Sequence, residues 1–490
     1  MASRSCSALY IDGEWVDTVE RETIINPATE AAIGEAPVGG PADVGHAIAA
    51  ARRAFDTGPW PSMPVERRQA MLSAFLDAID ARADEIVALI VAEAGSTQMM
   101  ARMLHYGVPM QHARHMVALA SRPAVTPLPV ETTPNMAGGL TLGAGVMVRD
   151  PVGVVAAITA YNFPFFLNLA KIIPALAVGC TVVLKPSPYT PMEALILGEI
   201  ADTAGLPKGV LNIVTGGKDV GEALTSDPRV DLVSFTGSDA VGAAIQAQAA
   251  PTLKRVLLEL GGKSAMIVRA DADLTEAAAN GLGGFTIHAG QGCALLTRHI
   301  VHNSVRGDYV SRLKAMAAYI KVGDPADPSV TMGPLIRDVA RTRTERYVEV
   351  ALSEGATLVT GGGRPGGLDK GFFFQPTLFD DVHNSHRIAR EEVFGPVGVV
   401  IGYDDDDEAI ALANDSDFGL SGGIFSTDVG RAYEMALRMR TGGVQINGGG
   451  GRMSSHAPFG GVKRSGYGRE YGVEGLNEFT TIKTVSFRGG

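Results

Sequence analysis

The sequence predicts an α/β protein in which a doubly wound parallel sheet is joined to a second α/β unit and to a protruding β arm. From Val154 onward, short runs rich in β-branched residues alternate with helical segments, which is typical of a parallel sheet covered by helices on both faces. The pair Gly261–Gly262 ends the last of these runs and marks the crossover into the second unit. A proline-rich extended stretch at 121–148 and an alternating tail at 475–490 predict the arm.

The composition is that of a large, well-packed protein rather than of a membrane or nucleic-acid-binding one. A chain of 490 residues is too long to fold around one ordinary hydrophobic core, and 46% of its residues are hydrophobic. The net charge of −11, with no block of Lys or Arg, argues against a nucleic-acid partner. No apolar stretch is uninterrupted enough for a signal peptide or a membrane span, so we expect a cytoplasmic protein with no membrane partner.

The three cysteines, Cys6, Cys180 and Cys293, are widely spaced and odd in number. This pattern excludes a disulfide framework and favours a reducing compartment. His383 and His386 fit one helical face, but no third ligand is near them in the sequence. Surface or capping roles are therefore favoured for both histidines, and no metal site is predicted.

The first unit is expected to begin with a strand and turn at 10–16, followed by helices over 42–120. Within these helices Met71, Phe75 and Ile79 recur every four residues, which places them on one buried stripe. Gly95 predicts a helix end. A further helix is predicted at 190–205, between buried strands. The predicted strands of this sheet are 154–160, 181–186, 211–215, 231–235 and 255–260.

These elements predict a discontinuous dinucleotide-binding domain at 1–120 and 149–260, because nucleotides bind doubly wound sheets at the carboxyl ends of the strands. A catalytic domain is expected at 261–440, after which 441–474 returns to the cofactor domain. The arm comprises 121–148 and 475–490, and the tail is expected to pair with 121–148 across a subunit boundary. Since an open strand edge there would invite aggregation, a homo-oligomer is expected.

Two features at predicted strand ends fit nucleotide binding. Gly237 and Ser238 follow a strand and open a helix, where backbone N–H groups and the helix dipole stabilise a phosphate. The spacing from Gly237 to Gly242 differs from the dinucleotide fingerprint, so a plain structural turn stays open as an alternative. Lys185 ends another strand at the same sheet edge, within reach of a ribose or a phosphate.

Cys293 stands in "GQGCALLTR", a glycine-bearing turn. By residue type alone, a buried hydrophobic role is the simplest interpretation. The neighbouring Gly290 and Gly292 favour a nucleophile instead, because bare backbone lets a carbonyl approach the sulfur and offers amide donors to an oxyanion. Glu259, at the end of a hydrophobic strand, is a candidate base because desolvation raises the pKa of a carboxyl group.

Nine motifs follow one another in the order found in the aldehyde dehydrogenase superfamily, which the chain resembles over essentially its full length. The resemblance implies that superfamily's fold and the oxidation of an aldehyde to its carboxylic acid. The motifs are "YNFPF", "LKPS", "FTGSDAVG", "LELGGKS", "GQGC", "EEVFGPV", "NDSDFGLS", "GGVQIN" and "PFGGVKRSGYGRE".

The resemblance implies a catalytic role for each matching residue. Cys293 would attack the aldehyde carbon, and the side-chain amide of Asn162 would hold the oxyanion together with the Cys293 backbone N–H. After hydride transfer to NAD(P) leaves a thioester, Glu259 would activate the water that hydrolyses it. Lys171 and Glu470 match a buried pair that relays the proton of Glu259, and the mechanism requires no metal.

The same resemblance implies NAD as the cofactor. Pro188 stands where NAD-preferring members commonly carry glutamate, which leaves NADP open. No arginine lies beside Lys185 to receive a 2′-phosphate, and this favours NAD. The implied cofactor-binding residues are Lys185 at the adenosine ribose, Ser238 at a phosphate, Glu392 at the nicotinamide ribose with Phe394 beside it, and Ser187, Gly237 and Gly261 in the same motifs.

The substrate tunnel implied by the family pattern is mostly apolar or aromatic and holds no arginine. We therefore expect a neutral, hydrophobic aldehyde rather than a semialdehyde acid. His456, close to Phe459, is a further candidate contact. The implied lining residues are Tyr161, Phe163, Phe166, Thr286, Ile287 and Phe459.

Gly292 and Leu295 depart from the family pattern around the nucleophile, and their effect on the pocket stays open. Retention of Glu259 favours water over coenzyme A as the acyl acceptor. A CoA-acylating dehydrogenase, a cofactor-independent thiol esterase and a catalytically silent scaffold remain as alternatives. The arm and the strand-like tail resemble the family's bridging elements and imply a homodimer or a homotetramer.

Overall fold

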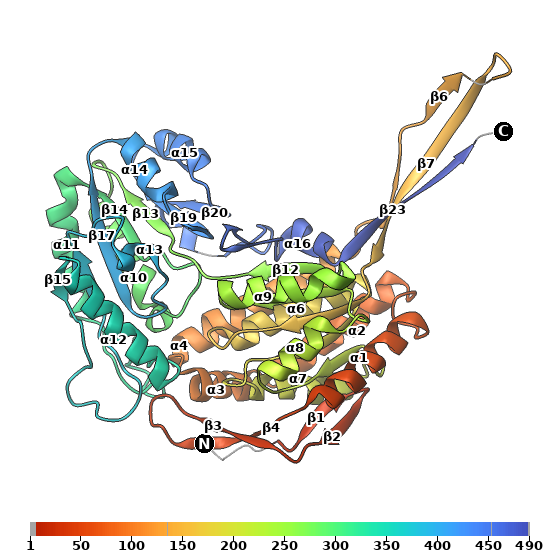
Figure 1. Cartoon of the computed structure of the whole chain (residues 1–490), viewed down its shortest axis with the longest axis horizontal. Helices are drawn as coiled ribbons and strands as arrows, with labels where there is room; N and C mark the ends of the chain where they lie inside the picture. Colours follow the sequence, from red (N-terminus) through yellow and green to blue (C-terminus); the bar gives the residue numbers. More distant parts are fainter. Residues whose placement is uncertain (1–5, 135, 452, 489–490) are drawn as a thin grey trace.

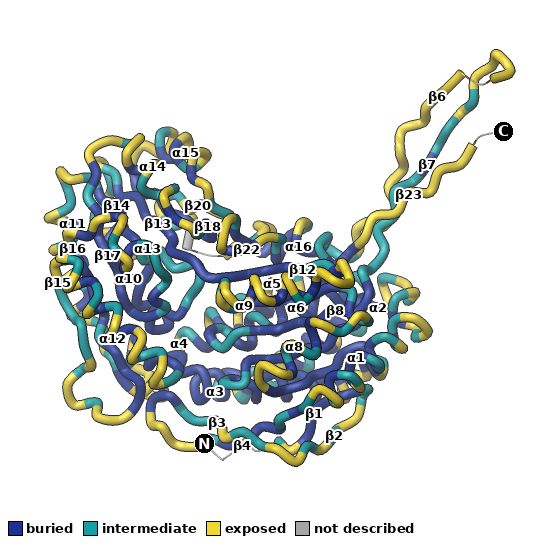
Figure 2. Tube along the Cα trace, in the orientation of Figure 1, coloured by how far each residue is buried: buried dark blue, intermediate teal, exposed yellow. Residues whose placement is uncertain are grey.

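Two sheets with their helices make up the body of the molecule, and a long β arm projects from it (Figure 1). The computed structural model describes residues 6–134, 136–451 and 453–488. The remaining residues of the predicted cofactor domain and arm, 1–5, 135, 452 and 489–490, lie outside the described residues. Figure 2 shows buried chain through both sheets and mostly exposed chain along the arm.

The first sheet has eight strands and contains all five strands predicted from the sequence. From β8 the chain builds outward first on one side and then on the other, so a crevice forms at the carboxyl ends of these parallel strands. β8 (Val154–Ile158) is flanked by β9 (Thr181–Lys185) and β10 (Leu211–Ile213) on one side and by β11 (Leu232–Thr236) and β12 (Arg255–Glu259) on the other. The antiparallel edge strands are β1 (Ala8–Ile11), β2 (Glu14–Asp17) and β22 (Gly466–Tyr467).

Helices cover both faces of this sheet, as the alternation of strands and helices predicted. Phe75 and Ile79 are fully buried and Met71 is partly buried, so the predicted stripe faces the core. Gly95 ends a helix in the left-handed conformation, with a φ of 70°. One face carries α2 (Val65–Asp80), α3 (Ala83–Ala94), α6 (Pro164–Val178) and α7 (Met192–Thr203), and the other carries α1 (Pro41–Asp56), α8 (Lys218–Ser226) and α9 (Asp239–Ala249).

The helical region between α3 and the arm contains a π-helical segment that the sequence did not predict. α4 (Gln98–Met100), η1 (Ala101–Gly107) and α5 (Val108–Leu119) follow one another without a break, and η1 has π-helical hydrogen bonding. α5 packs on α6 beside the first sheet. Because a π-helical turn changes the angle at which side chains leave a helix, such turns are frequent at functional sites.

The second sheet has seven strands and lies in the other half of the body. It includes β20 (Gly443–Ile446), so this unit extends past the boundary predicted at residue 440; the other domain ranges stay predictions. Its parallel strands are β13 (Ala265–Val268), β14 (Arg298–His302), β16 (Thr377–Asp380), β17 (Val397–Tyr403), β19 (Ser421–Phe425) and β20, and β15 (Thr357–Thr360) is antiparallel. The accompanying helices are α10 (Leu274–Thr286), α11 (Asn303–Ala317), α12 (Asp338–Ser353), α13 (Arg387–Arg390), α14 (Asp406–Asn414) and α15 (Val429–Arg438).

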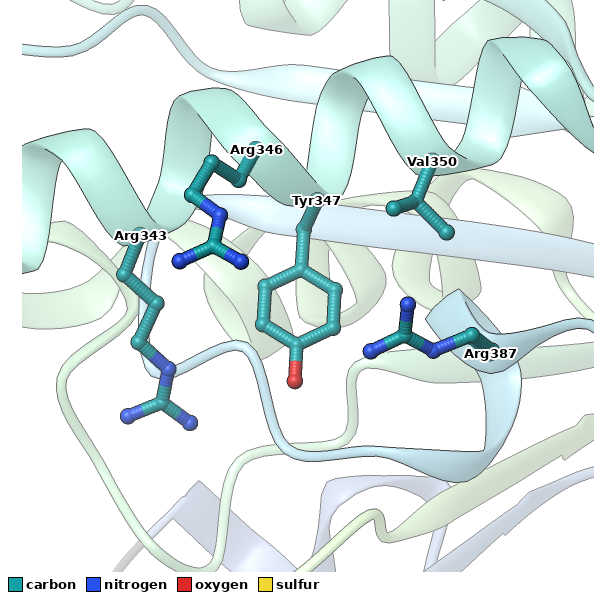
Figure 3. A pocket seen from close by; sticks show the side chains of 5 residues that line it. All are labelled: Arg343, Arg346, Tyr347, Val350 and Arg387. Carbon is teal, nitrogen blue, oxygen red and sulfur yellow. The ribbon is translucent and has the colours of Figure 1, made fainter.

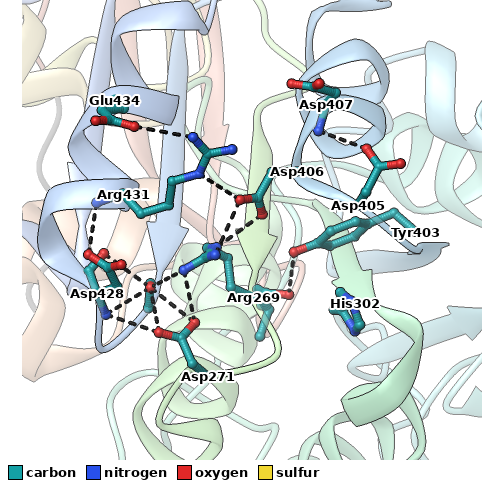
Figure 4. Close-up of polar contacts among 12 residues, drawn as sticks. Arg269, Asp271, His302, Tyr403, Asp405, Asp406, Asp407, Asp428, Arg431 and Glu434 are labelled. Atoms are coloured by element: carbon teal, nitrogen blue, oxygen red, sulfur yellow. Dashed lines mark hydrogen bonds and ion pairs between the residues drawn. The ribbon is translucent and has the colours of Figure 1, made fainter.

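Ion pairs fasten α14 and α15 to the end of β13 (Figure 4). The Nε atom of Arg269 lies 3.0 Å from Oδ1 of Asp406, and the Nε atom of Arg431 lies 2.8 Å from Oδ2 of the same carboxylate. Asp271 accepts a hydrogen bond of 2.9 Å from Ser426 beside them. The acidic run at 404–407 opens α14, and Asp405 caps this helix.

The arm consists of β5 (Val125–Pro127), β6 (Glu131–Pro134), β7 (Leu140–Pro151) and β23 (Thr480–Arg488). β23 pairs antiparallel with β7 of the same chain, from Thr480 opposite Pro151 to Arg488 opposite Gly143. The sequence correctly predicted that these two segments pair. Both strands belong to one chain, so the predicted pairing across a subunit boundary was wrong. α16 (Gly472–Glu478) delivers the chain to the base of β7, where the Val152 N–H donates to the Phe479 carbonyl at 2.9 Å.

The remaining short elements are β3 (Arg21–Ile25), β4 (Ala32–Pro37), β18 (Phe418–Gly419), β21 (Val462–Lys463), η2 (Ala250–Thr252), η3 (Ile287–Gly290) and η4 (Asn447–Gly451). Among the described residues, no helix is both long and apolar enough to cross a bilayer. In the same part of the chain, no group of three or more His, Cys, Asp or Glu side chains is arranged to hold a metal ion.

Candidate active site

Cys293 lies on a turn that follows three residues in the left-handed backbone region. His288, Ala289 and Gly290 have φ values of 49°, 54° and 75°. For non-glycine residues this conformation costs about 1–3 kcal/mol each and persists only where the surroundings impose it. A Cβ atom on Gly262 would lie 2.5 Å from the Cys293 carbonyl oxygen, so glycine is needed there to let the turn approach the end of β12.

The Cys293 thiol lies among carboxyl groups. Cys293 is half-buried, and loss of water around the thiol raises its pKa above the usual range. The charges of Glu259, Glu392 and Glu470 raise this pKa further, and only the Cys293 backbone N–H opposes them. The thiol is therefore protonated at neutral pH and needs a base before it attacks a carbonyl carbon.

Glu259 is placed to be that base. It is 2% exposed, and neither carboxyl oxygen has a hydrogen-bond partner among the described residues. Burial raises the pKa of Glu259 well above its ordinary value, the charge of Glu470 raises it further, and Lys171 opposes both. A buried carboxyl with a raised pKa and free lone pairs suits general base catalysis near neutral pH.

Lys171 and Glu470 form a buried ion pair next to Glu259. The Lys171 Nζ atom lies 2.7 Å from Oε1 of Glu470 and donates a second bond, of 3.1 Å, to Oγ of Ser234. Glu470 is held by two backbone hydrogen bonds of 2.7 Å with Phe459. Ser234 on β11 is a member of this group that sequence reasoning missed. The pair thus has fixed positions on α6 and before α16 from which its charges act on Glu259.

Asn162 points its amide toward the turn that carries the nucleophile. Its Nδ2 atom donates to the Gln291 carbonyl oxygen at 2.9 Å. Gln291 is itself fixed, because its Oε1 atom accepts from the Ile336 N–H at 2.9 Å. Since a side-chain amide has two N–H groups, one remains for an oxyanion. Gln291 was not predicted, although it belongs to the quoted "GQGC" motif.

A cleft of about 150 Å³ at the carboxyl ends of β8, β11 and β12 reaches Cys293. It brings together seven residues that the sequence assigned to the catalytic or cofactor site, namely Asn162, Gly237, Ser238, Gly261, Cys293, Glu392 and Phe394. Sequence reasoning missed four others that line it, namely Ala160, Thr236, Leu260 and Arg343. This is the crevice that a doubly wound sheet offers to a nucleotide.

Glu392 and Gly261 fit each other within this cleft. The Gly262 N–H donates to Oε1 of Glu392 at 2.9 Å, and a Cβ atom on Gly261 would lie 2.2 Å from Oε2. Only glycine therefore leaves room for the carboxylate at this position. Burial raises the pKa of Glu392 to about 7. Phe394 follows with a φ of 56°, and its ring lies 6.1 Å from that of Tyr161.

The residues predicted to bind the phosphate and the adenosine ribose stand at the start of α9 and at the end of β9. Ser238 caps α9 by accepting from the Val241 N–H at 3.4 Å, so the helix begins at the cleft. Burial lowers the pKa of Lys185 to about 8, and the charges of Asp219 and Glu22 partly restore it. Ser187 is buried, and its Oγ atom accepts from the Tyr189 N–H at 3.3 Å, which shapes the turn after β9.

The predicted substrate residues are divided between two places. Phe163, Phe166 and Phe459 share an aromatic cluster with Tyr471, which was not predicted. Tyr161 lies apart from them, on the cofactor cleft with Glu392 and Phe394. Thr286 and Ile287 stand at the end of α10, where Thr286 donates to the Leu282 carbonyl at 2.8 Å, and the exposed His456 ring lies 4.0 Å from that of His115.

A basic groove adjoins the cofactor cleft through Arg343 (Figure 3). Its volume is about 270 Å³, and Tyr347 forms its floor with the hydroxyl donating to Oε2 of Glu391 at 2.7 Å. The positive charge at this mouth attracts anionic groups such as phosphates. The groove is lined by Arg343, Arg346, Tyr347 and Val350 of α12 and by Arg387 of α13.

Comparison with known proteins gives one consistent result. Residues 15–485 match the model of the aldehyde dehydrogenase family. A 3-succinoylsemialdehyde-pyridine dehydrogenase of a Pseudomonas species is 40% identical over 489 residues, which cover 98% of each chain. A putative aldehyde dehydrogenase of Staphylococcus aureus strain USA300 is 39% identical and covers 99% of each chain.

Solved structures are similar over the same length. An aldehyde dehydrogenase of Mycobacterium tuberculosis complexed with NAD+ superimposes with a TM-score of 0.92 at 42% identity, covering 99% of this chain and 98% of that one. A betaine aldehyde dehydrogenase of Staphylococcus aureus in complex with NAD+ gives 0.93 at 37% identity, covering 98% and 95%.

Proposed function

The chain belongs to the aldehyde dehydrogenase family, and we propose that it uses Cys293, Glu259 and Asn162 to oxidise a neutral, hydrophobic aldehyde to its carboxylic acid with NAD. The observation that carries the proposal is the cleft in which Cys293 and Asn162 meet the cofactor-binding residues. The charge of Glu259 raises the pKa of the same thiol.

In the first half of the reaction Glu259 accepts the thiol proton and Cys293 bonds to the aldehyde carbon. The carbonyl oxygen becomes an oxyanion, which receives the second N–H of Asn162 and the backbone N–H of Cys293. When NAD is bound, its nicotinamide supplies the acceptor for the hydride that leaves this carbon. The carbon then remains on the sulfur as a thioester.

Once Glu259 has released the thiol proton to solvent, it takes a proton from water in the second half, and the resulting hydroxide attacks the thioester carbon. The carbon–sulfur bond breaks, the acid leaves, and the thiolate regains a proton. Lys171 favours and Glu470 disfavours the charge on Glu259, so the pair sets how readily Glu259 takes up and releases a proton. Glu259 therefore serves both halves without moving into water.

We extend the proposal to a preference for NAD over NADP despite the proline at position 188. Lys185, the residue for the adenosine ribose, faces the negative charges of Asp219 and Glu22. A 2′-phosphate placed at this lysine would meet both carboxylates. Their repulsion supports NAD where the glutamate common in the family is absent.

The substrate class, the oligomeric state and the location belong to the same proposal. The aromatic cluster around Phe163, Phe166 and Phe459 supports an uncharged, apolar substrate. The Pseudomonas relative is named for a pyridine-bearing semialdehyde, so a pyridyl aldehyde belongs in any substrate panel. The exposed apolar side chains on the arm, such as Val485 and Phe487, support a dimer or tetramer. The sparse, odd-numbered cysteines support the cytoplasm.

The test is an aldehyde panel run with each cofactor. Hexanal, benzaldehyde, pyridine-3-carboxaldehyde and succinic semialdehyde are incubated with NAD or NADP, with and without coenzyme A, and NADH or NADPH absorbance is followed with Cys293→Ala as the control. We expect NADH from hexanal and benzaldehyde, independent of coenzyme A and absent in the variant. Faster turnover of succinic semialdehyde would contradict the substrate class. Ester cleavage without any NADH would contradict the function.

A further inference from the structure

Histidines gather around the aromatic cluster next to the nucleophile. The sequence contains 10 histidines, and only His456 was considered at this site beforehand. Imidazole rings lie against Phe163, Phe166 and Tyr471, and others lie against one another. The five histidines are His105, His112, His115, His288 and His456.

His105 is turned into the protein by the π-helical segment η1. It is fully buried and stacks on Phe163, with ring centroids 4.5 Å apart and planes inclined by 28°. Neither ring nitrogen has a hydrogen-bond partner among the described residues. Leaving a buried donor or acceptor unpaired costs about 1–3 kcal/mol, so most buried polar atoms in folded proteins have a partner.

His288 approaches the same ring from the nucleophile side. It is 6% exposed, and its ring lies 4.9 Å from His105 and 5.5 Å from Phe163. Its left-handed backbone, with a φ of 49°, directs the side chain away from the path of a normal helix end. The Asn162 backbone faces the His288 ring. His288 therefore lies between the residue that holds the oxyanion and His105.

Both imidazoles are neutral in this environment. Burial lowers the pKa of His288 to about 4, and burial together with the charge of His288 lowers the pKa of His105 well below its ordinary value. A neutral imidazole offers one N–H donor and one nitrogen acceptor, and it offers no charge to a carboxylate. The pair is thus suited to an uncharged group that donates or accepts a hydrogen bond.

We propose that His105 and His288 determine substrate specificity by hydrogen-bonding an uncharged polar group on the ring of an aromatic aldehyde, such as a phenolic hydroxyl or a ring nitrogen. Phe163, which touches both histidines, provides the apolar face on which the aromatic ring packs. This inference rests on the proposed function and narrows its substrate class from hydrophobic aldehydes to aromatic aldehydes with one polar substituent.

The test compares ratios of kcat/KM within one enzyme preparation. The substrates are benzaldehyde, the three hydroxybenzaldehydes and the three pyridine carboxaldehydes, each with NAD. We expect at least one substituted aldehyde to exceed benzaldehyde by about tenfold, the effect of one good hydrogen bond. His105→Phe, which keeps the stacked ring, should remove most of that advantage while benzaldehyde turnover persists.

Two further variants separate specificity from folding. His288→Asn keeps a residue that tolerates the left-handed conformation and should also lower the ratio. His46→Phe replaces an exposed histidine on α1 and should leave the ratio unchanged. If the native enzyme prefers benzaldehyde to every substituted aldehyde, the inference is overturned. It is also overturned if His105→Phe leaves the ratio of kcat/KM between the substituted aldehyde and benzaldehyde unchanged. Absence of NADH from all seven aldehydes would instead refute the proposed function.

Discussion

Gly292 and Leu295 occupy one volume: a Cβ atom on Gly292 would lie 2.8 Å from Cγ of Leu295. The two departures from the family pattern flanking Cys293 are therefore a single change, in which the leucine side chain fills the space that a side chain before the nucleophile would take. The turn remains filled, and it keeps its position against Gly262.

The Gly292–Leu295 relationship predicts coupled effects of substitution. Gly292→Ala alone should overpack the turn, destabilise the protein by about 1–3 kcal/mol and lower kcat/KM. Gly292→Ala with Leu295→Ala should recover most of both losses, because the added methyl group then has room. Urea unfolding and NADH production measure the double-mutant cycle. Additive losses in the double variant would show that the two side chains do not share space.

Replacement of Glu259 should affect the acylation of Cys293 and the hydrolysis of the thioester differently as the pH changes. Glu259→Gln should lower steady-state turnover by about 10²–10⁴-fold at neutral pH, because neither the thiol nor water then loses its proton readily. Raising the pH ionises Cys293 without a base, so the initial NADH burst should return before turnover does. Stopped-flow absorbance resolves the burst. A burst at the native rate in neutral solution would exclude Glu259 from thiol activation.

The Lys171–Glu470 pair predicts opposite shifts of the pH–rate profile. Lys171 lowers and Glu470 raises the pKa of Glu259, whose ionised form is the active base. Lys171→Met should move the acidic limb toward higher pH, and Glu470→Gln should move it toward lower pH. Lys171→Met should also cost about 3–5 kcal/mol of stability, since a buried carboxylate loses its partner. Glu474→Gln, on the exposed side of α16, is the control and should shift nothing. Shifts of the same sign in both variants would contradict this arrangement.

The carboxylates around Lys185 predict that cofactor choice responds to charge. Asp219→Asn should raise kcat/KM with NADP relative to NAD, and Pro188→Glu should lower it, each by about tenfold. Asp202→Asn, exposed at the end of α7, should leave the ratio unchanged. Steady-state kinetics with both cofactors and one aldehyde give the ratio. A native preference for NADP would overturn the assignment of Asp219.

The arm predicts a subunit contact on one face of β23. Val485 and Phe487 lie on the same side of this strand and are 45% and 55% exposed. Val485→Asp with Phe487→Asp should shift the protein to a smaller species in sedimentation velocity. Val19→Asp, at another fully exposed position, should not. A monomeric native protein, or an unchanged size in the double variant, would remove the arm from any assembly.

Local patterns were sufficient for much of the fold. The five strands of the first sheet were predicted because each is a short buried run between turn signals, and the parallel order follows from the helices between them. The subunit that supplies the partner strand of the tail was not predictable in the same way. Alternation in 475–490 indicates a strand that needs an edge, but it does not say which chain supplies the edge.

The candidate site was predictable where a motif fixes both residue and backbone. Glu259 and Cys293 belong to such motifs, whereas Tyr161 was assigned to the substrate side although it faces the cofactor cleft. The direction of a loop side chain depends on packing that no spacing encodes. The histidine cluster had a weak signal, since His105 and His112 recur on one helical face. No sequence signal indicated the π-helical turn or the left-handed backbone of His288, because both oppose the local conformational preference of their residues.

Gly262 links the two halves of the chemistry thermodynamically. Its N–H holds Glu392, and its missing side chain receives the carbonyl of Cys293. Any ligand that draws the carboxylate away from this N–H must therefore alter the energy of the nucleophile's turn. By linkage, occupancy of the cleft beside Glu392 and reversible addition of an aldehyde to the sulfur each change the affinity of the other by the same factor. The affinity of the enzyme for a reversibly bound aldehyde is accordingly a readout of how much cofactor it has bound.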